Sequence, residues 1–403
     1  MLNTPFSPWP SFTREEARAV EEVLLSNRVN YWTGSQGRDF EREFAAAMGS
    51  EYAIAVSNGT VALELALRGL GIGPGDEVIV TPRTFLASAS CIAAVGATPV
   101  FADVDRNSQN ITVASVAAVI TPATRAIIAV HLAGWPCEMA GLMALSRNGI
   151  HIIEDCAQAH GARYRGQGVG TIGKVGCWSF CQDKIMTTGG EGGMVTTNDP
   201  DLWQRMWAYK DHGKSWQAIH EQSHPSGFRW LHHSLGTNWR MTEMQAAIGR
   251  IQLRRLPEWS VARRGNAGRI WEAARECPGL RVPTIPEHID HAAYKCYVFV
   301  EPQALKEGWS RDRIIQEVTT RGVPCYSGSC SEVYLEKAFD DTGRRPESRL
   351  PVARELGETS LMFLCHPTLT EAEIDTTCRV LEEVMGEGLR RSVAKGGERP
   401  APP

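Results

Sequence analysis

The stretch Ile150-His151-Ile152-Ile153-Glu154-Asp155 indicates how this chain is expected to fold, because it is typical of a buried strand that ends at an acid. A second apolar run, Cys177-Trp178-Ser179-Phe180-Cys181, is followed by Lys184 and then by a glycine cluster at 189–193. In an open α/β sheet, residues at the carboxyl ends of neighbouring strands face the same ligand crevice. We therefore expect Asp155 and Lys184 to share one crevice.

An amine and a carboxylate in one crevice match the chemical needs of pyridoxal 5′-phosphate (PLP). The amine of Lys184 can form a Schiff base with the cofactor aldehyde. The carboxylate of Asp155 can keep the ring nitrogen protonated, so that the ring acts as an electron sink. These two residues favour a PLP-dependent enzyme.

Length, composition and charge describe a globular protein with two domains. The 403 residues exceed one ordinary core, and 43% hydrophobic with 22% charged residues is typical of a soluble protein. The formal net charge of −4 argues against a general nucleic-acid or anionic-membrane surface. No run is long enough to span a bilayer, so no membrane association is expected.

The 11 cysteines are interpreted as reduced thiols of a cytoplasmic protein, because residues 1–8 do not resemble an export signal. Two groups, Cys325 with Cys330 and Cys365 with His366, could be taken for metal ligands. No second pair at zinc-like spacing accompanies them, so no metal is expected.

Strand-like and helix-like segments alternate along the first 256 residues. Strands are expected at 52–56, 77–81, 99–102 and 126–131, and helices at 14–25 (after a capping box at 13–16), 61–67 and 85–95. This alternation favours an α/β fold with a mostly parallel sheet and helices on both faces. Beyond Pro257 long charged helices dominate, and 297–300 is the clearest strand. We predict a large PLP-binding domain over 1–256, a smaller domain over 257–388 and a disordered tail over 389–403.

Ser57-Asn58-Gly59-Thr60 lies between the first strand and its helix, where a phosphate could bind. Gly59 lets the backbone approach an anion, and the free N–H groups of a helix start bind phosphate. Thr60 and, on the strand before Lys184, Ser179 could add hydroxyl donors. The alternatives are an ordinary capped turn and a buried strand serine.

Three further side chains are candidates for the same crevice. Phe85 is expected to open a helix at a strand end, where it could stack on the cofactor ring, although a core phenylalanine is the alternative. Gln158 could hydrogen-bond the phenolic oxygen of the ring, and a surface glutamine is its alternative. His160 could line the crevice, but a lone histidine is more often structural.

These motifs, taken in order, resemble the DegT/DnrJ/EryC1/StrS family of sugar aminotransferases, which are fold-type I PLP enzymes. The resemblance extends from Ser11 to about Leu256 and continues more weakly to Pro367. It rests on the blocks at 57–63, 73–79 with 84–85, 154–161, 178–180, 184 with 189–193, and 236–241. The segment at 182–188 differs from the form common in the family, in which an aromatic residue and a proline precede the lysine.

The resemblance implies a large domain with a mostly parallel seven-stranded sheet flanked by helices, and a smaller α+β C-terminal domain. It also implies a homodimer with shared active sites, in which Asn238 reaches the phosphate of the neighbouring subunit's cofactor. The implied roles are the Schiff base and proton transfer for Lys184, the ring nitrogen for Asp155, the phenolic oxygen for Gln158, ring stacking for Phe85, and phosphate binding for Gly59, Thr60 and Ser179.

The implied substrates are an amino donor, expected to be L-glutamate, and a nucleotide-linked keto-sugar, of which the 4-keto-6-deoxy class is favoured. The product would be an amino sugar for a surface polysaccharide or a secondary metabolite. Candidate sugar contacts are Trp32, His212, Phe228 and Arg240, and packing between subunits is their alternative. A 3-keto sugar stays open, as do a fold-type I enzyme that acts on amino acids and a non-catalytic PLP-binding sensor.

Overall fold

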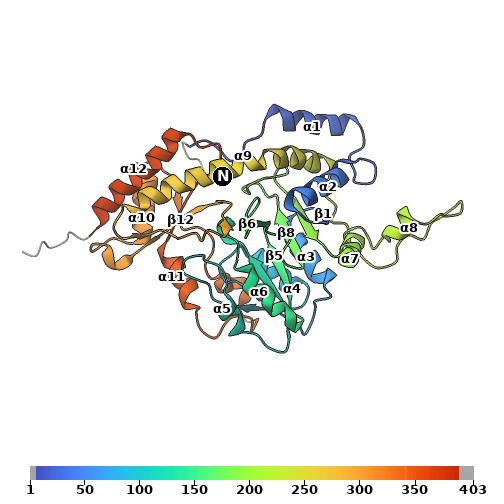
Figure 1. The fold of residues 1–403 in the computed structure, drawn as a ribbon, viewed down its shortest axis with the longest axis horizontal. Coiled ribbons are helices and arrows are strands. Elements are labelled where there is room, and N and C mark those ends of the chain that lie inside the picture. Colours follow the sequence, from blue (N-terminus) through green and yellow to red (C-terminus); the bar gives the residue numbers. More distant parts are fainter. Residues whose placement is uncertain (1–5, 341, 390–403) are drawn as a thin grey trace, which may run out of the picture.

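A seven-stranded sheet forms the centre of the protein, in a computed structural model that describes residues 6–340 and 342–389 (Figure 1). Its strand order is β1-β9-β8-β5-β4-β2-β3. Only β9 runs antiparallel to its neighbours, which confirms the prediction of a mostly parallel α/β sheet. The strands are β1 (Tyr52–Val56), β2 (Glu77–Val80), β3 (Thr98–Phe101), β4 (Thr124–Val130), β5 (His151–Asp155), β8 (Val175–Ser179) and β9 (Gly193–Thr197).

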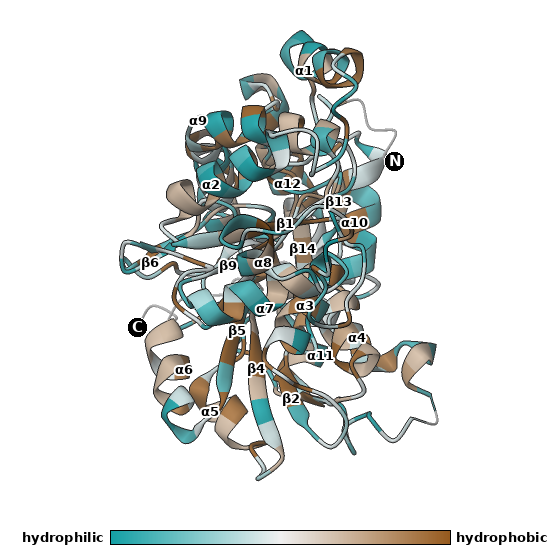
Figure 2. Cartoon of the chain, turned by 90° about the vertical axis from the view of Figure 1, so that its right-hand side faces the viewer, coloured by the Kyte–Doolittle hydropathy of each residue, from teal (hydrophilic) through white to brown (hydrophobic). Residues whose placement is uncertain are grey.

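Both faces of this sheet are buried, because successive strand residues pack on helices of opposite sides. Ile128 and Ile153 belong to the core beneath α3 (Gly59–Gly69), α4 (Ala87–Ala94) and α7 (Pro200–Lys210). Ile127 and Ile152 belong to the core under α5 (Val113–Ala117) and α6 (Met139–Leu145). Figure 2 shows the hydrophobic residues concentrated on β2, β4 and β5.

The loop between β2 and α4 differs from the sequence expectation. The helix begins at Ala87, so the prediction that Phe85 opens it was wrong by two residues. The physical reason is a contact with a distant segment, since the Thr84 N–H donates to the Cys330 carbonyl (3.1 Å) and the Val333 N–H to the Pro82 carbonyl (2.9 Å). These bonds hold the residues before Phe85 against the distant segment and leave Phe85 outside the helix.

Helix α9 (Glu243–Arg275) connects the two parts of the protein. Its first half packs on α1 (Arg14–Leu25) and α2 (Gln36–Met48), and its second half on α12 (Glu371–Gly388) and β12 (Cys296–Val300), as Figure 1 shows. The boundary predicted near Leu256 therefore lies inside one continuous helix that passes through Pro257. The division into residues 1–256 and 257–388 stays a proposal.

The C-terminal part contains a four-stranded antiparallel sheet in the order β10-β12-β14-β13. Its other elements are β10 (Leu280–Arg281), β13 (Cys325–Tyr326), β14 (Ser360–Phe363), α10 (Arg311–Thr320) and α11 (Pro351–Thr359). Among the described residues, the remaining α-helix is α8 (Trp216–His220), and the remaining strands form a small sheet of β6 (Arg163–Tyr164), β7 (Gln167–Gly168) and β11 (Ile289–Asp290); five short 3-10 helices lie between the other elements. The predicted tail falls outside the described residues from 390 onward, and Leu389 pairs with Leu305.

Two observations bear on the expected surroundings of the protein. All 11 cysteines are unpaired. Over residues 6–340 and 342–389, no helix is both long enough and apolar enough to cross a membrane.

The start of α2 is held by an acid on α9. Its N-cap residue, Ser35, makes no side-chain cap, and the Glu243 carboxylate instead accepts hydrogen bonds from the N–H groups of Gln36 (2.6 Å) and Gly37 (3.0 Å). Glu243 is fully buried, and it satisfies one buried and one half-buried N–H group of the first helical turn, which have no acceptor within the helix.

We expect Glu243→Ala to lower the free energy of unfolding by about 3 kcal/mol, because a buried and a half-buried donor lose a charged acceptor. The measurement is the urea unfolding midpoint, followed by circular dichroism. Glu258→Ala, at an exposed position of the same helix, is the matched control and should stay within about 0.5 kcal/mol of the unchanged protein. Equal midpoints for the two variants would contradict this role for Glu243.

Candidate active site

A pocket of about 610 Å³ opens at the carboxyl ends of β1, β2, β5 and β8. The structure brings Asp155 and Lys184 together in its wall, as expected for residues at neighbouring strand ends. The other sequence-predicted residues that line it are Gly59, Thr60, Phe85, Gln158 and Ser179.

Asp155 is the last residue of β5, and its carboxylate is buried and held on both oxygens. Ser88 Oγ donates to Oδ2 (2.8 Å), and the Ala157 N–H donates to Oδ1 (3.1 Å). Burial raises the pKa of Asp155, and these two hydrogen bonds oppose the rise. A cationic partner, such as a protonated ring nitrogen, would compensate the buried negative charge.

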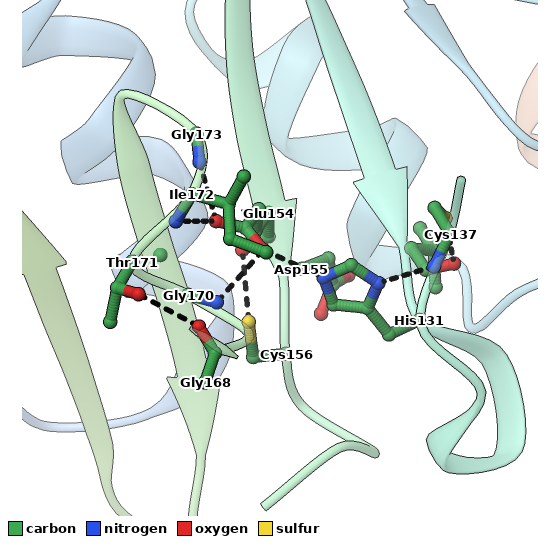
Figure 3. A network of polar contacts seen from close by, with 12 residues as sticks. His131, Cys137, Glu154, Asp155, Cys156, Gly168, Gly170, Thr171, Ile172 and Gly173 are labelled. Atoms are coloured by element: carbon green, nitrogen blue, oxygen red, sulfur yellow. Dashed lines mark hydrogen bonds and ion pairs between the residues drawn. The ribbon is translucent and has the colours of Figure 1, made fainter. Parts of the chain in front are cut away.

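A brace on the opposite face of β5 fixes this strand end (Figure 3). The Glu154 carboxylate accepts hydrogen bonds from the N–H groups of Gly170 (2.8 Å), Ile172 (2.8 Å) and Gly173 (2.6 Å). It also contacts His131 Nε2 (3.0 Å). The Cys137 N–H donates to His131 Nδ1 (3.0 Å), so Nε2 carries the proton and donates to Glu154.

The potential metal ligands in the described residues are already engaged in hydrogen bonds. His131, Glu154 and Cys156 are close enough together to share an ion, but both histidine nitrogens and both carboxylate oxygens take part in the brace. In one of the two groups considered from the sequence, Cys365 Sγ donates to the Ala293 carbonyl, and His366 Nδ1 contacts Thr368 Oγ1. These groups act as structural hydrogen-bonding residues.

Lys184 lies in a turn after β8 that is fixed from outside the sheet. Its carbonyl accepts a hydrogen bond from the indole of Trp9 (2.8 Å), and its side chain is only 16% exposed. Nζ lies 3.2 Å from Asp183 Oδ1 and 3.5 Å from the Tyr294 hydroxyl. The amine is therefore held within the pocket wall.

The opposite end of the pocket is formed by the start of α3. The Asn58 side chain caps this helix by accepting from the Val61 N–H (3.0 Å). A Cβ atom at Gly59 would lie 2.6 Å from Ser179 Cβ, so only glycine lets the helix start approach the end of β8. Free N–H groups of the first turn and the hydroxyls of Thr60 and Ser179 make this end suitable for the cofactor phosphate.

The positions of Phe85, Gln158 and His160 show which of these side chains can face the pocket and which is structural. Phe85 is 71% exposed in the pocket wall, so it is not a core residue. Gln158 is buried, and its Oε1 accepts from the Ala133 N–H (2.8 Å), which leaves its NH₂ group as a donor toward the pocket. His160 packs on Trp178 and Phe180, and burial lowers its pKa to about 3. A structural role for His160 is therefore favoured over a role in lining the crevice.

Five predicted residues do not line the pocket of their own chain: Trp32, His212, Phe228, Asn238 and Arg240. The Trp32 ring packs edge-on against Trp207, and Arg240 Nη1 pairs with Asp211 Oδ1 (2.7 Å). Asn238 forms an isolated antiparallel β-bridge with Asp211, and the His212 carbonyl contacts His232 Nδ1. Phe228 is 78% exposed in the loop that follows α8, which projects from the body in Figure 1.

Ser88, Asp183 and Tyr294 contact the two central side chains but were not predicted. Ser88 lies four residues after Thr84, and the Ser88 hydroxyl is 2.9 Å from Thr84 Oγ1. Asp183 is adjacent to Lys184 in the sequence. Tyr294 lies more than 100 residues away, and nothing local in the sequence indicates its contact.

The chain matches the family model of the DegT/DnrJ/EryC1/StrS aminotransferase family over residues 10–382. It is 38% identical to UDP-N-acetyl-3-dehydro-alpha-D-glucosamine 3-aminotransferase of Acidithiobacillus ferrooxidans, over 89% of this chain and 90% of that protein. The aminotransferase from Psychrobacter cryohalolentis has a similar solved structure, with a TM-score of 0.94, 62% identity and coverage of 95% and 99% of the two chains. A putative sugar aminotransferase of Streptococcus pneumoniae, solved in its PLP-form, gives a TM-score of 0.84 at 27% identity over 96% and 100%.

We expect Asp155→Asn to stabilise the cofactor-free protein at neutral pH. A carboxyl group whose folded pKa is raised binds its proton more tightly in the folded state, so the free energy of unfolding falls as the pH rises above about 4. Asparagine does not titrate, so the variant should gain about 2 °C in melting temperature at pH 7 and less at pH 4.

The control for this comparison is Asp290→Asn, at an exposed position. Its melting temperature should follow that of the unchanged protein at both pH values. A constant offset between Asp155→Asn and the unchanged protein from pH 4 to pH 7 would contradict the raised pKa of Asp155.

Proposed function

Since the chain belongs to the DegT/DnrJ/EryC1/StrS aminotransferase family and is a PLP-dependent sugar aminotransferase, we propose that it moves an amino group from L-glutamate to the keto carbon of a nucleotide-linked sugar. The observation that carries the proposal is the pocket in which a buried acid, an amine and a glycine-opened helix start converge. The residues present fit PLP at its ring nitrogen, its aldehyde and its phosphate. When bound, the cofactor supplies the electron sink that makes the carbon next to the transferred nitrogen acidic.

In this proposal the side chains that line the pocket have defined roles toward the cofactor. Lys184 bonds the cofactor and moves the proton at the reacting carbon, while Asp155 keeps the ring nitrogen protonated. Phe85 stacks on the ring, and the NH₂ group of Gln158 donates to the phenolic oxygen. Gly59, Thr60 and Ser179 hold the phosphate.

The charges that line the pocket support a homodimer with shared active sites. Asp155, Asp183 and Glu191 are balanced only by Lys184 among the described lining residues. The cofactor phosphate, the diphosphate of a nucleotide sugar and the carboxylates of the donor are all anionic, so further positive charge must come from elsewhere. We propose that a second copy supplies it.

The segment that would reach the second copy is the loop between α8 and α9. Three apolar side chains there are strongly exposed: Phe228 (78%), Trp230 (82%) and Leu235 (94%). The loop also carries Arg229, His232 and His233, and it projects from the body (Figure 1). Large exposed apolar groups beside basic ones are typical of a surface that another chain covers. In this arrangement Trp32, His212, Phe228, Asn238 and Arg240 serve the partner's pocket or its rim.

The acceptor is proposed to be a 4-keto-6-deoxy sugar, with a 3-keto sugar as the alternative that the name of the Acidithiobacillus relative suggests. The product would enter a surface polysaccharide or a secondary metabolite. We place the reaction in the cytoplasm, which is consistent with 11 unpaired cysteines.

The test of the proposed function is the visible absorbance of the purified protein with PLP, before and after addition of L-glutamate, followed by nucleotide-linked 4-keto and 3-keto sugars. We expect a visible band that glutamate bleaches and one keto-sugar restores, and no such band in Lys184→Ala. If oxo acids but no keto-sugar restore the visible band, the protein would be an enzyme that acts on amino acids. A band that no amino donor bleaches would indicate a sensor.

The shared site is tested by mixing two inactive variants, Lys184→Ala and Asn238→Asp. If Asn238 serves the neighbouring subunit, one site of each mixed dimer has an unchanged lysine and an unchanged asparagine. Activity should then return to about a quarter of that of the unchanged enzyme, because half of the dimers are mixed and each has one intact site. No recovery after subunit exchange, verified by mass spectrometry of the mixed dimer, would contradict the shared site.

A further inference from the structure

Asp183 and Tyr294 form a pair of oxygen groups around the amine of Lys184. Asp183 Oδ1 lies 3.2 Å from Lys184 Nζ, and the Tyr294 hydroxyl lies 3.5 Å from it. The Tyr294 hydroxyl also donates a short hydrogen bond to Asp183 Oδ2. The three groups therefore form a closed triangle, with the amine at one corner.

The two members of the pair differ in how firmly they are held. Tyr294 is buried, and its N–H donates to the carbonyl of Ala133 (3.0 Å), the residue whose own N–H holds Gln158. The Asp183 side chain is 57% exposed, so the phenol is the group that directs this carboxylate toward the amine rather than toward water.

The pKa shifts of Asp183 and Tyr294 indicate which of the two groups carries a charge. Burial acts to raise the pKa of Asp183, but the charges of Lys184 and Lys295 and the hydrogen bond from Tyr294 outweigh it and lower the pKa. Burial raises the pKa of Tyr294 well above its ordinary value, so the phenol stays neutral and donates. Asp183 is therefore an anion that faces the amine at neutral pH.

We propose that Asp183 is a positioning residue that holds the amine of Lys184 in the pocket wall whenever the lysine is not bonded to the cofactor, and that Tyr294 fixes Asp183 in this role. Asp183 belongs to the segment 182–188, where this chain departs from the common form of the family. The inference rests on the proposed role of Lys184.

The proposal has a consequence for how the protein captures its cofactor. The lysine adds to the aldehyde only as a neutral amine, and one water molecule leaves as the bond forms. The Asp183 carboxylate attracts the amine only when the amine is charged, so loss of the carboxylate's charge should change how capture depends on pH. The other charged or titratable groups around the pair are Lys295 and Arg263 on the C-terminal side, His160 beneath the site, and Asp155 and Glu191 in the pocket wall.

The experiment is stopped-flow absorbance of PLP capture by the cofactor-free protein between pH 6 and pH 10. Asp183→Asn should move the midpoint of the rate profile down by about one pH unit, because the charge is lost while the shape is kept. Asp183→Glu keeps the charge and should restore most of the shift. Tyr294→Phe should give part of the shift, because the freed carboxylate turns toward solvent.

Two controls separate the possible outcomes. Glu191→Gln removes one charge from the same pocket, but its carboxylate makes only a 3.9 Å contact with Cys181 Sγ, so the midpoint should move much less. An equal shift for Glu191→Gln and Asp183→Asn, or no shift for Asp183→Asn, would overturn the positioning role. No shift for Tyr294→Phe would overturn the part assigned to Tyr294. The same visible band in Lys184→Ala would instead remove the lysine from its proposed role.

Discussion

The buried carboxylate of Asp155 is the constraint on which the rest of the site depends. A negative charge at the end of a buried strand is unfavourable unless hydrogen bonds or a cation compensate it. Ser88 and the Ala157 N–H supply two hydrogen bonds on the pocket side, and the Glu154 brace fixes the same strand end from the other face. The adjacent acids of β5 therefore have opposite tasks: one closes a structural network, and the other is left ready for a cationic ligand.

The opposite end of the pocket offers hydrogen-bond donors of this chain to a negatively charged group, and the second copy is proposed to add positive charge there. There the approach of α3 to β8, which Gly59 permits, presents backbone N–H groups and two hydroxyls. In the proposed arrangement the phosphate lies at this end, so Lys184 at the other end is available to react with the aldehyde. The pocket thus contains a buried acid, a helix start that suits an anion, and an exposed aromatic side chain, Phe85, in its wall.

The sequence predicted what depends on local patterns and on the geometry of parallel sheets. The strand at 52–56 agrees with β1 to the residue, and Asp155, Lys184 and Ser179 share a pocket because strand ends meet at one edge. The start of α4 was misplaced because Cys330, far along the chain, binds the preceding loop. Tyr294 was missed for the same reason. The proposed roles of Asn238 and Arg240 depend on a second chain, so neither the sequence pattern nor one subunit can establish them.

The position of Lys184 shows why distant segments matter to a local reaction. Its backbone is held by Trp9, before the first helix, and its amine contacts Tyr294, which precedes β12 of the C-terminal sheet. Trp9 packs edge-on against Trp259 of α9, the helix that spans both parts of the protein. A shift of the C-terminal part relative to the central sheet would therefore move the lysine against Asp155, which is fixed to β5. The continuity of α9 through Pro257 restricts such a shift, so this helix stabilises the geometry of the site as well as the fold.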